Sequence, residues 1–261
     1  MNILDKIVAH KKNEVAQAKQ KTNIQQLENT AFFKRNTFSL TNTIQKTNST
    51  GIIAEFKKKS PSKGIINDAF SSIEIVPQYE QAGVAGSSIL TDNAFFGGCN
   101  DDLIAVREQV QIPLLRKEFM IDEYQFVEAK SIGADVILLI ASILTPLQVK
   151  QFTDLAQSLH LEVLLELHDE TELNHVYHKV DMVGINNRNL KTFEVDIEQS
   201  IRMASELGND FVKVAESGIS STDTLHYFKQ NGFQGFLIGE NFMKTAQPGL
   251  ACRNFIQSLQ K

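Results

Sequence analysis

The sequence contains little cysteine and no long apolar run. Its 261 residues include two cysteines, Cys99 and Cys252, which are too few and too far apart for a disulfide framework or a paired-cysteine zinc motif. No stretch approaches the roughly 18 consecutive apolar residues of a membrane helix, and the N-terminus has no signal-peptide core. We therefore expect a soluble protein of the reducing cytoplasm, without a membrane partner.

An excess of positive charge is also absent. The chain has 26 Lys and Arg residues against 31 Asp and Glu residues, for a net charge of -5, whereas nucleic-acid binding requires a basic patch. No Gly-x-Gly-x-x-Gly turn follows the first apolar run, so a dinucleotide site lacks its phosphate-binding turn. No His, Cys and carboxylate residues have metal-ligand spacing. We expect no nucleic acid, no metal and no cofactor.

From residue 51 onward, short apolar runs alternate with segments of helical periodicity. Continuous runs of Val, Ile and Leu are typical of parallel strands that are buried on both faces. The runs cover residues 51–56, 87–92, 112–119, 135–140, 161–167, 181–186, 211–217 and 235–240. Helices are expected between and after them, at about 71–82, 101–110, 122–132, 146–159, 169–179, 196–207, 222–231 and 248–260.

This repeated unit predicts an α/β fold, the closed (β/α)8 TIM barrel. Right-handed crossovers and short connections leave few other arrangements, and about 250 residues is the usual length of such a barrel. An open doubly wound sheet is the structural alternative. Residues 2–20 have the spacing of an amphipathic helix, and the polar connector that follows suggests one more short helix. We therefore divide the chain into an N-terminal helical extension packing on the barrel, 1–50, and a catalytic barrel, 51–261.

Charged and polar side chains follow several of the predicted strands. The active site of a barrel lies at the carboxyl ends of its strands, so residues placed there indicate chemistry. Five strands end in such residues: Glu55 with Lys57, Arg116 to Glu118, Glu166, Asn186 with Arg188, and Glu216 with Ser217. The alternative is a ring of salt bridges that only ties the strand ends together.

The first strand ends in three consecutive lysines. Side chains alternate between the two faces of a strand, so Glu55 and Lys57 share one face. We expect this pair to point into the barrel mouth and Lys58 and Lys59 to lie outside it. Burial and neighbouring charges move lysine and glutamate pKa values toward neutrality, which suits them to proton transfer.

Glycines follow the last two strands, at Gly218 and Gly239. In these two loops barrels bind phosphate through backbone amides. The pair therefore favours a phosphorylated small-molecule substrate, although a single glycine could serve a tight turn.

Six separated motifs resemble one family. They are "IIAEFKKKSPSKG", "LLRKEFMID", "LLELHDETEL", "GINNRNLKTFEVD", "VAESGI" and "FLIGENFMK", and in this order they are similar to the signatures of indole-3-glycerol-phosphate synthase. The resemblance covers the chain from about residue 51 to its end, and the preceding helix resembles the family's extra segment. It implies a carboxy-lyase of tryptophan biosynthesis, which closes the pyrrole ring of 1-(2-carboxyphenylamino)-1-deoxyribulose 5-phosphate with loss of carbon dioxide and water.

The resemblance also implies catalytic roles. Lys117 matches the general acid that protonates the ketose carbonyl during ring closure. Glu166 matches one partner of the later acid and base pair, with Lys57 placed to help, and Glu55 orients these lysines.

Further positions are implied to contact the substrate. Asn186 and Arg188 match residues at the anthranilate part, and Glu216 and Ser217 match residues at the ribulose part. The phosphate falls to Lys57, Gly218, Gly239 and the amide of Glu240. The remaining predicted contacts are Ser60 near the carboxylate, Phe96 in the anthranilate pocket, and Leu237.

Some residues and functions remain as alternatives. Cys99 and Asn241 stand where serine is usual in the family, and His168 is expected to take no chemical step because it follows Glu166 in a polar turn. A phosphoribosylanthranilate isomerase, a Schiff-base aldolase and a non-catalytic scaffold are the other readings of the barrel. We expect a monomer, with a homodimer as the alternative.

Overall fold

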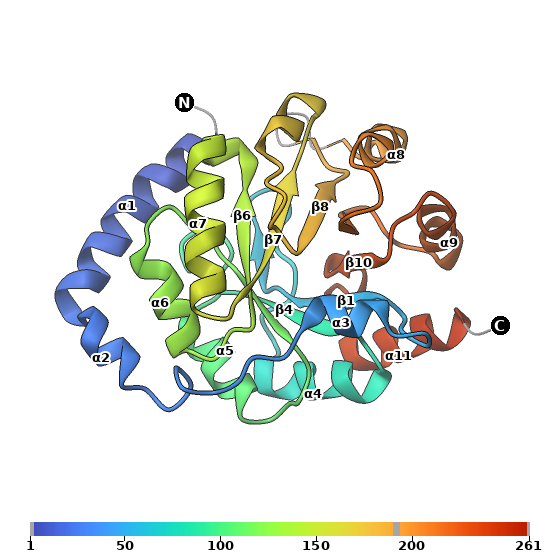
Figure 1. Cartoon of the computed structure of the whole chain (residues 1–261). Coiled ribbons are helices and arrows are strands. Elements are labelled where there is room, and N and C mark those ends of the chain that lie inside the picture. The colour runs from blue at the N-terminus through green and yellow to red at the C-terminus, as the bar shows by residue number, and fades with distance from the viewer. Residues whose placement is uncertain (1–2, 190–193, 260–261) are drawn as a thin grey trace.

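The computed structural model describes residues 3–189 and 194–259 and shows a closed barrel (Figure 1). The barrel strands of this described chain pair in the order β1-β10-β9-β8-β7-β6-β5-β4, and every pair is parallel. They are β1 (Ile52–Phe56), β4 (Gly86–Leu90), β5 (Leu114–Lys117), β6 (Val136–Ile140), β7 (Glu162–Leu167), β8 (Met182–Asn186), β9 (Val212–Glu216) and β10 (Gly235–Ile238). The predicted (β/α)8 barrel is confirmed, and the open sheet is wrong.

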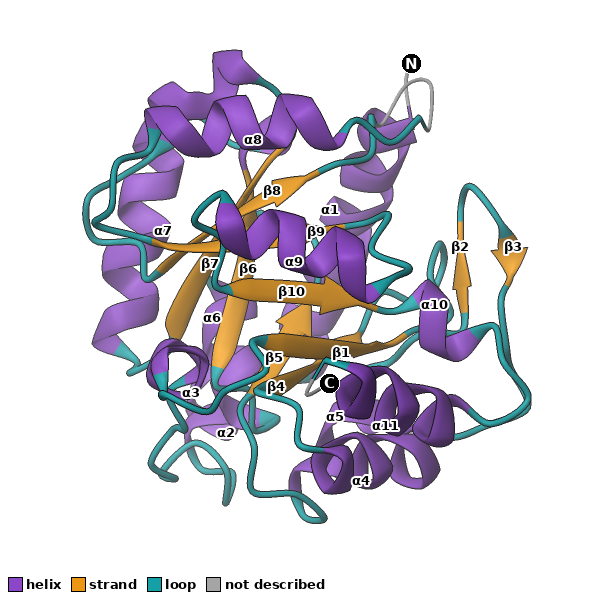
Figure 2. Cartoon of the chain, turned by 90° about the vertical axis from the view of Figure 1, so that its right-hand side faces the viewer, coloured by secondary structure: helices purple, strands orange, loops and turns teal. Residues whose placement is uncertain are grey.

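Helices follow the strands and cover the outside of the barrel (Figures 1 and 2). Their starts have clear local causes: Thr145 and Gln148 form a capping box before α7, and the Ser221 side chain caps α9. The helices between and after the strands are α4 (Ser72–Ala82), α5 (Asn100–Arg107), α6 (Tyr124–Ser131), α7 (Pro146–Ser158), α8 (Ile197–Glu206), α9 (Thr222–Gln230), the short α10 (Glu240–Met243) and α11 (Pro248–Ser258).

Three local predictions need correction. The α-helix predicted at 169–179 is only a 3-10 helix, η2 (Glu170–His175), whose start is fixed by the Asp169 side chain accepting from the Thr171 amide. A second 3-10 turn, η1 (Ala141–Ile143), follows β6, and the loop after β1 contains a hairpin of β2 (Lys59–Ser60) and β3 (Gly64–Ile65). The ends predicted at residues 2 and 260 lie outside the described residues.

Alternation along the strands separates two layers of core. Leu165 of β7 points outward and packs under the helices, whereas Leu164 points into the barrel with Ile53, Leu115 and Val214. The next inward position of β7 after Leu164 is two residues on, at the strand end. The same two-residue step carries Leu164 to Glu166, Ile53 to Glu55, Leu115 to Lys117 and Val214 to Glu216.

The N-terminal region contacts both ends of the barrel. It forms α1 (Ile3–Lys21) and, in place of the single short helix predicted, two: α2 (Ile24–Glu28) and α3 (Leu40–Gln45). Leu40 and Ile44 of α3 join the inner core at the amino end, and a Cβ on Gly86 would meet Leu40 Cδ1 at 2.7 Å. The division of the chain at residue 51 stays a prediction.

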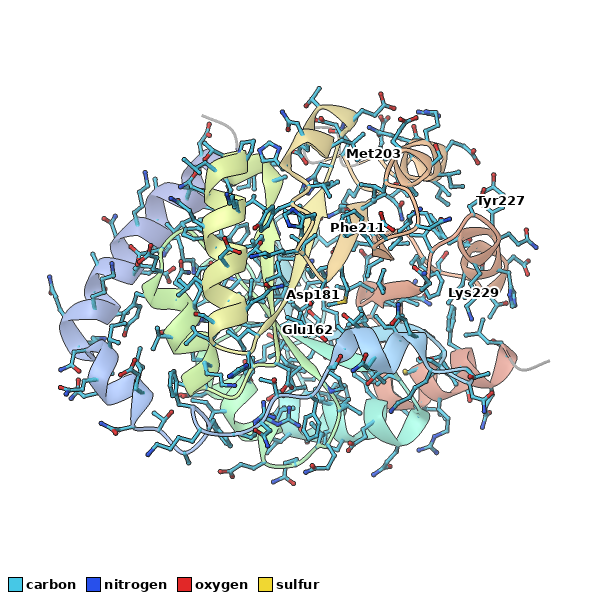
Figure 3. The ribbon with its side chains drawn as sticks, viewed as in Figure 1. Glu162, Asp181, Met203, Phe211, Tyr227 and Lys229 are labelled. Carbon is cyan, nitrogen blue, oxygen red and sulfur yellow. The ribbon has the colours of Figure 1, made fainter. Side chains whose placement is uncertain are left out.

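Charged residues at the amino end of the barrel have structural contacts. Glu162 and Asp181 begin the region of β7 and β8 and lie together there (Figure 3). Glu162 accepts from the backbone amides of Leu40 and Thr41, at 2.8 and 3.0 Å, and thereby fixes the start of α3. Burial, together with the charge of Glu162, raises the pKa of Asp181 to about 6. The Glu162 carboxylate at this end therefore has a structural role, because it joins β7 to α3.

Leu40 closes the amino end of the inner core, so we expect a shorter side chain there to lower the free energy of unfolding strongly. The Leu40 side chain is fully buried, and replacing a buried leucine by alanine costs about 2–5 kcal/mol of unfolding free energy. We expect Leu40→Ala to lower the urea midpoint accordingly. Leu147→Ala, which changes an exposed residue of α7, is the matched control and should change the urea midpoint little. Equal effects of the two substitutions would contradict the role of Leu40 in closing the core.

Candidate active site

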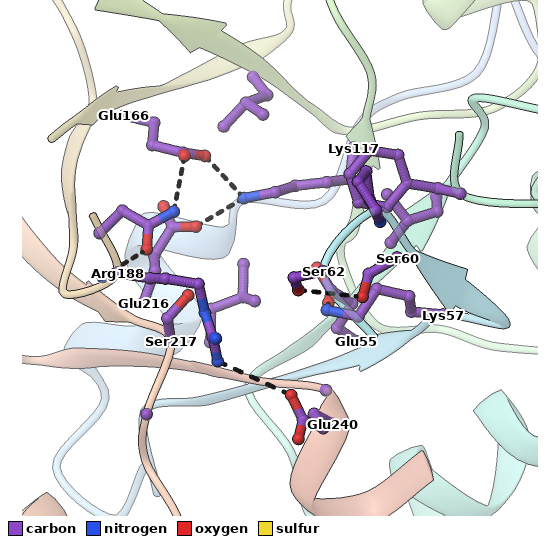
Figure 4. Close-up of a pocket in the computed structure, with 18 of the residues that line it drawn as sticks. Glu55, Lys57, Ser60, Ser62, Lys117, Glu166, Arg188, Glu216, Ser217 and Glu240 are labelled. Atoms are coloured by element: carbon purple, nitrogen blue, oxygen red, sulfur yellow. Dashed lines mark hydrogen bonds and ion pairs between the residues drawn. The ribbon is translucent and has the colours of Figure 1, made fainter. Parts of the chain in front are cut away.

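A cavity of about 350 Å³ opens at the carboxyl ends of the strands. The structure brings every predicted site residue to its wall: Glu55, Lys57, Ser60, Phe96, Lys117, Glu166, Asn186, Arg188, Glu216, Ser217, Gly218, Leu237, Gly239 and Glu240. Figure 4 shows the charged members pointing toward one another. The individual roles of these residues stay predictions.

Lys117 is the centre of the cavity's charge network (Figure 4). Its Nζ donates to Glu166 Oε2 at 2.8 Å and to Glu216 Oε2 at 2.5 Å. Asn186 donates from Nδ2 to the other oxygen of Glu166 at 2.9 Å. Four strands, β5, β7, β8 and β9, therefore supply one continuous network of donors and acceptors.

The network sets different protonation states for its members. Burial by itself lowers the pKa of Lys117, but the adjacent Glu166 and Glu216 carboxylates outweigh it and hold that pKa above its ordinary value. Burial would raise the pKa of Glu166, yet Lys117 keeps it well below the usual range. Burial and the charge of Glu166 raise the pKa of Glu216 to about 7. Lys117 is thus cationic and Glu166 is ionised, whereas Glu216 titrates near neutral pH.

The three lysines after β1 divide as expected from the sequence, and alternation accounts for the first two. Lys57 Nζ lies 2.5 Å from Glu55 Oε1, and both side chains line the cavity. Lys58 instead pairs with Asp102 of α5 at 3.0 Å, and Lys59 donates to the Ala94 carbonyl at 2.9 Å. Only the first lysine of the three therefore reaches the site.

The loops after β9 and β10 bring backbone close to the cavity. Ser217 and Gly218 both have positive φ, 66° and 74°, and a serine rarely adopts this conformation. Asn187 holds the turn by donating from Nδ2 to the Ser217 carbonyl at 2.7 Å. At Gly239 a Cβ would meet Glu55 Oε1 at 2.6 Å, so a side chain has no room there. Strain of this kind gathers at functional sites.

The sequence did not identify all residues that line the cavity. Ile3, Leu4 and Ile7 of α1 form an apolar part of its wall, and Ser62 of the β2–β3 hairpin and Lys244 after α10 also contribute. The apolar spacing of α1 was visible in the sequence, but nothing there indicated which surface it covers. Residues 190–193 of the fourth motif lie outside the described residues.

The sequence did not indicate that His168 is buried at the cavity wall. Its side chain is 8% exposed and lines the cavity, and its Nε2 lies 2.9 Å from Glu166 Oε1. The turn after β7 is polar in sequence, but η2 folds back over it and removes the imidazole from water. The sequence signal that could have indicated this position was a histidine two residues after Glu166, close to the end of β7.

A buried ion cluster fastens α1 to the mouth. Lys11 is 4% exposed, and its Nζ lies 3.0 Å from Asp92, 2.9 Å from Glu118 and 2.6 Å from Glu14. Asp92 also accepts from the Phe96 amide at 3.1 Å. One lysine thus ties α1 to the loop that carries Phe96 and to the residue that follows Lys117.

The fold and the site together define a class: a barrel enzyme whose acid and base groups gather at the carboxyl ends of parallel strands. Within residues 3–189 and 194–259, no helix is long and apolar enough to cross a membrane. In the same ranges no group of three or more His, Cys, Asp or Glu side chains could hold a metal ion. Proton transfer is the chemistry that the described side chains offer.

Comparison with known proteins identifies the family. The family model "Indole-3-glycerol phosphate synthase" matches residues 4–255. A protein of that name from Bacteroides thetaiotaomicron is 46% identical over 259 residues, which cover 99% of each chain. Another from Acinetobacter baumannii is 40% identical and covers 95% of this chain and 93% of that protein. The chain therefore belongs to the indole-3-glycerol phosphate synthase family and is a carboxy-lyase of tryptophan biosynthesis.

Solved structures support the fold. The tryptophan synthase alpha chain from Legionella pneumophila superposes with a TM-score of 0.62 at 11% identity, covering 85% of this chain and 95% of that one. The 3-hexulose-6-phosphate synthase from Salmonella typhimurium gives 0.59 at 12% identity, covering 80% and 98%. Identities this low show a shared barrel and nothing about the reaction.

The raised pKa of Glu216 predicts a stability effect that depends on pH. Below its ordinary value of 4.5 both the folded and the unfolded chain are protonated at this residue. Between 4.5 and about 7 the folded protein keeps a proton that the unfolded chain has released, so the unfolding free energy falls as pH rises. Glutamine cannot ionise and avoids this loss.

We therefore expect the difference in melting temperature, Glu216→Gln minus the unsubstituted protein, to grow as pH rises from about 4.5 to about 7. Thermal unfolding followed by circular dichroism at several pH values measures the difference. The exposed Glu28→Gln in α2 is the control, and its difference should stay flat. A constant or falling difference for Glu216→Gln would contradict the assigned direction.

Proposed function

We propose that the cavity binds 1-(2-carboxyphenylamino)-1-deoxyribulose 5-phosphate and closes its pyrrole ring, using Lys117 as the general acid. The observation that carries the proposal is the position of Lys117, which lies between two buried carboxylates inside the cavity. A cation held there is aimed at the place where a carbonyl oxygen gains negative charge.

In the first step the aromatic carbon that bears the carboxylate attacks the ketose carbonyl. A carbon–carbon bond forms, and Lys117 donates a proton to the carbonyl oxygen, which becomes a hydroxyl. In the free site two carboxylates hold this proton firmly. A substrate that takes their place around Nζ weakens that hold, so Lys117 becomes a stronger acid when the substrate is bound.

In the later steps carbon dioxide leaves, which restores the aromatic ring, and the hydroxyl departs as water. This departure needs one group to give a proton to the oxygen and another to take a proton from the neighbouring methylene carbon of the new five-membered ring. We assign this pair to Glu166 and Lys57, with Glu55 holding Lys57 through its 2.5 Å contact. Both glutamates are nearly inaccessible to water, which strengthens their effect on the charges.

The binding roles follow the positions around this centre. Arg188, whose guanidinium suits a carboxylate or an aromatic face, would contact the anthranilate part with Asn186, against Phe96 and Leu237. Ser60 would contact the carboxylate, and Glu216 and Ser217 the ribulose. The phosphate would lie against Lys57 and the backbone at Gly218, Gly239 and Glu240, which all line one cavity.

For the whole protein we propose a cytoplasmic monomer without nucleic-acid or membrane partners. Free Cys99 and Cys252 suit a reducing compartment, and the net charge of -5 disfavours binding to nucleic acid. Light scattering at several protein concentrations tests the monomer against the homodimer.

Replacing Lys117 is the direct test of the reaction. We expect Lys117→Ala to lower turnover of the carboxyphenylamino substrate by about 10²–10⁴-fold, the usual contribution of a general acid, while circular dichroism shows a retained barrel. Lys179→Ala, which removes an exposed lysine paired with Asp154, is the control and should turn over normally.

Two other outcomes would favour other functions. If the folded, unsubstituted protein did not convert this substrate, the synthase reaction would be contradicted. A substrate imine trapped on Lys57 or Lys117 by borohydride would indicate an aldolase, because the proposed reaction forms no bond to lysine.

Removal of metal ions should leave the reaction unchanged, because side chains supply all the proton transfers proposed above. Turnover is measured after dialysis against a chelator and again after a divalent ion is added. A large loss of rate that the ion restores would show that the acid–base scheme is incomplete.

A further inference from the structure

We propose that His168 is a positioning residue that fixes the orientation and the negative charge of Glu166. This inference rests on the role given to Glu166 in the proposed function. The family motif assigns no step to His168, and the sequence places it in a polar turn. The structure instead places its imidazole between two carboxylates, Glu166 and Glu172.

The far side of the imidazole is held by η1 and η2. Its Nδ1 lies 3.0 Å from Ser142 Oγ and 3.6 Å from Glu172 Oε2. The same Glu172 oxygen accepts from the backbone amide of His168 at 2.7 Å. Glu172 is 8% exposed and Ser142 is exposed, so the carboxylate of this support is shielded from water and the hydroxyl is at the surface.

Counting hydrogens assigns the protonation of the ring. The Ser142 hydroxyl donates its one proton to Glu172 Oε1, so toward His168 it can only accept. Nδ1 therefore carries a proton. On the other side, Nε2 lies 2.9 Å from Glu166 Oε1, and two bare lone pairs at that distance would repel. A second proton, on Nε2, makes this contact attractive, although the N–H does not point at Oε1 and forms no hydrogen bond with it.

That second proton belongs to the imidazole. Glu166 already accepts from Lys117 at Oε2 and from Asn186 at Oε1, and such a set of donors favours the ionised carboxylate. The contact from Nε2 is a close ion pair that lies off the ideal hydrogen-bond direction. Burial lowers the pKa of His168, but Glu166 and Glu172 outweigh it and raise that pKa to about 10.

This arrangement has a consequence for catalysis. Glu166 faces three groups, Lys117, Asn186 and His168, and all three line the cavity, where the substrate can reach them. His168 is anchored on the other side by Ser142 and Glu172, which do not line the cavity. When the substrate engages Lys117, His168 remains as the fixed cation that orients the Glu166 carboxylate.

The test compares His168→Ala with His168→Gln, whose amide restores a neutral donor near the Nε2 position. We expect His168→Ala to lower kcat about tenfold to a hundredfold, the range seen when partners that orient metal-binding groups are removed, with a smaller change in KM. Loss of the positive charge raises the pKa of Glu166, so the acid limb of the kcat profile moves to higher pH. His168→Gln should regain part of kcat but keep the shifted limb.

The control is His226→Gln, which changes an exposed histidine on α9 and should alter neither kcat nor the pH profile. An unchanged kcat and profile in His168→Ala would overturn the proposal. A fall in activity that only follows the loss of folded protein, with an unshifted profile, would also overturn it, because it would show a structural role alone.

A measurement on the unsubstituted protein is independent of turnover. Nitrogen NMR of the His168 imidazole should show both ring nitrogens protonated through about pH 8, and Glu172→Gln should lower the pH at which the ring titrates. Titration near the ordinary value of 6.5 would refute the imidazolium. If Glu166→Gln kept full turnover while NMR showed the charged ring, the proposed role of Glu166 would fail instead.

Discussion

The site depends on one constraint: a lysine ammonium and two carboxylates are kept out of water at the end of an apolar barrel. Desolvation costs several kcal/mol for each ion, and mutual attraction offsets it only when geometry is close and further hydrogen bonds are made. Lys117 satisfies this condition with contacts of 2.8 and 2.5 Å to Glu166 and Glu216. Burial raises the pKa of Glu216, and the charge of the neighbouring Glu166 carboxylate raises it further.

The barrel is what makes such a cluster possible. Residues two apart in a strand share a face, so each apolar residue inside the barrel specifies where the polar residue at its end will point. Leu164 leads to Glu166, and Val214 leads to Glu216. Parallel pairing then aligns the ends, since Asn186 pairs with Glu216 across β8 and β9. The positions of the charges follow from strand geometry, and the helices need only hold the strands in register.

This geometry explains which predictions from sequence were correct. The inward direction of Glu55 and Lys57 and the outward direction of Lys58 needed only alternation, which is local. The contacts of Lys11 with Asp92 and Glu118 join segments that are far apart in the chain, and no local pattern specifies them. The environment of His168 was missed for the same reason. Its burial depends on η2, where the pattern predicted an α-helix.

The N-terminal helix joins the site through the same physical rule. Lys11 is less exposed than Lys117 and, like it, is compensated by more than one carboxylate, with Asp92 and Glu118 near 3 Å. Burial lowers the pKa of Lys11, and these carboxylates outweigh it and hold it above the ordinary value, so the ammonium stays charged. Breaking a buried pair leaves an unpaired charge at a cost of about 3–5 kcal/mol, which makes separation of α1 from the mouth expensive. The helix that brings Ile7 to the cavity is therefore held as part of the wall.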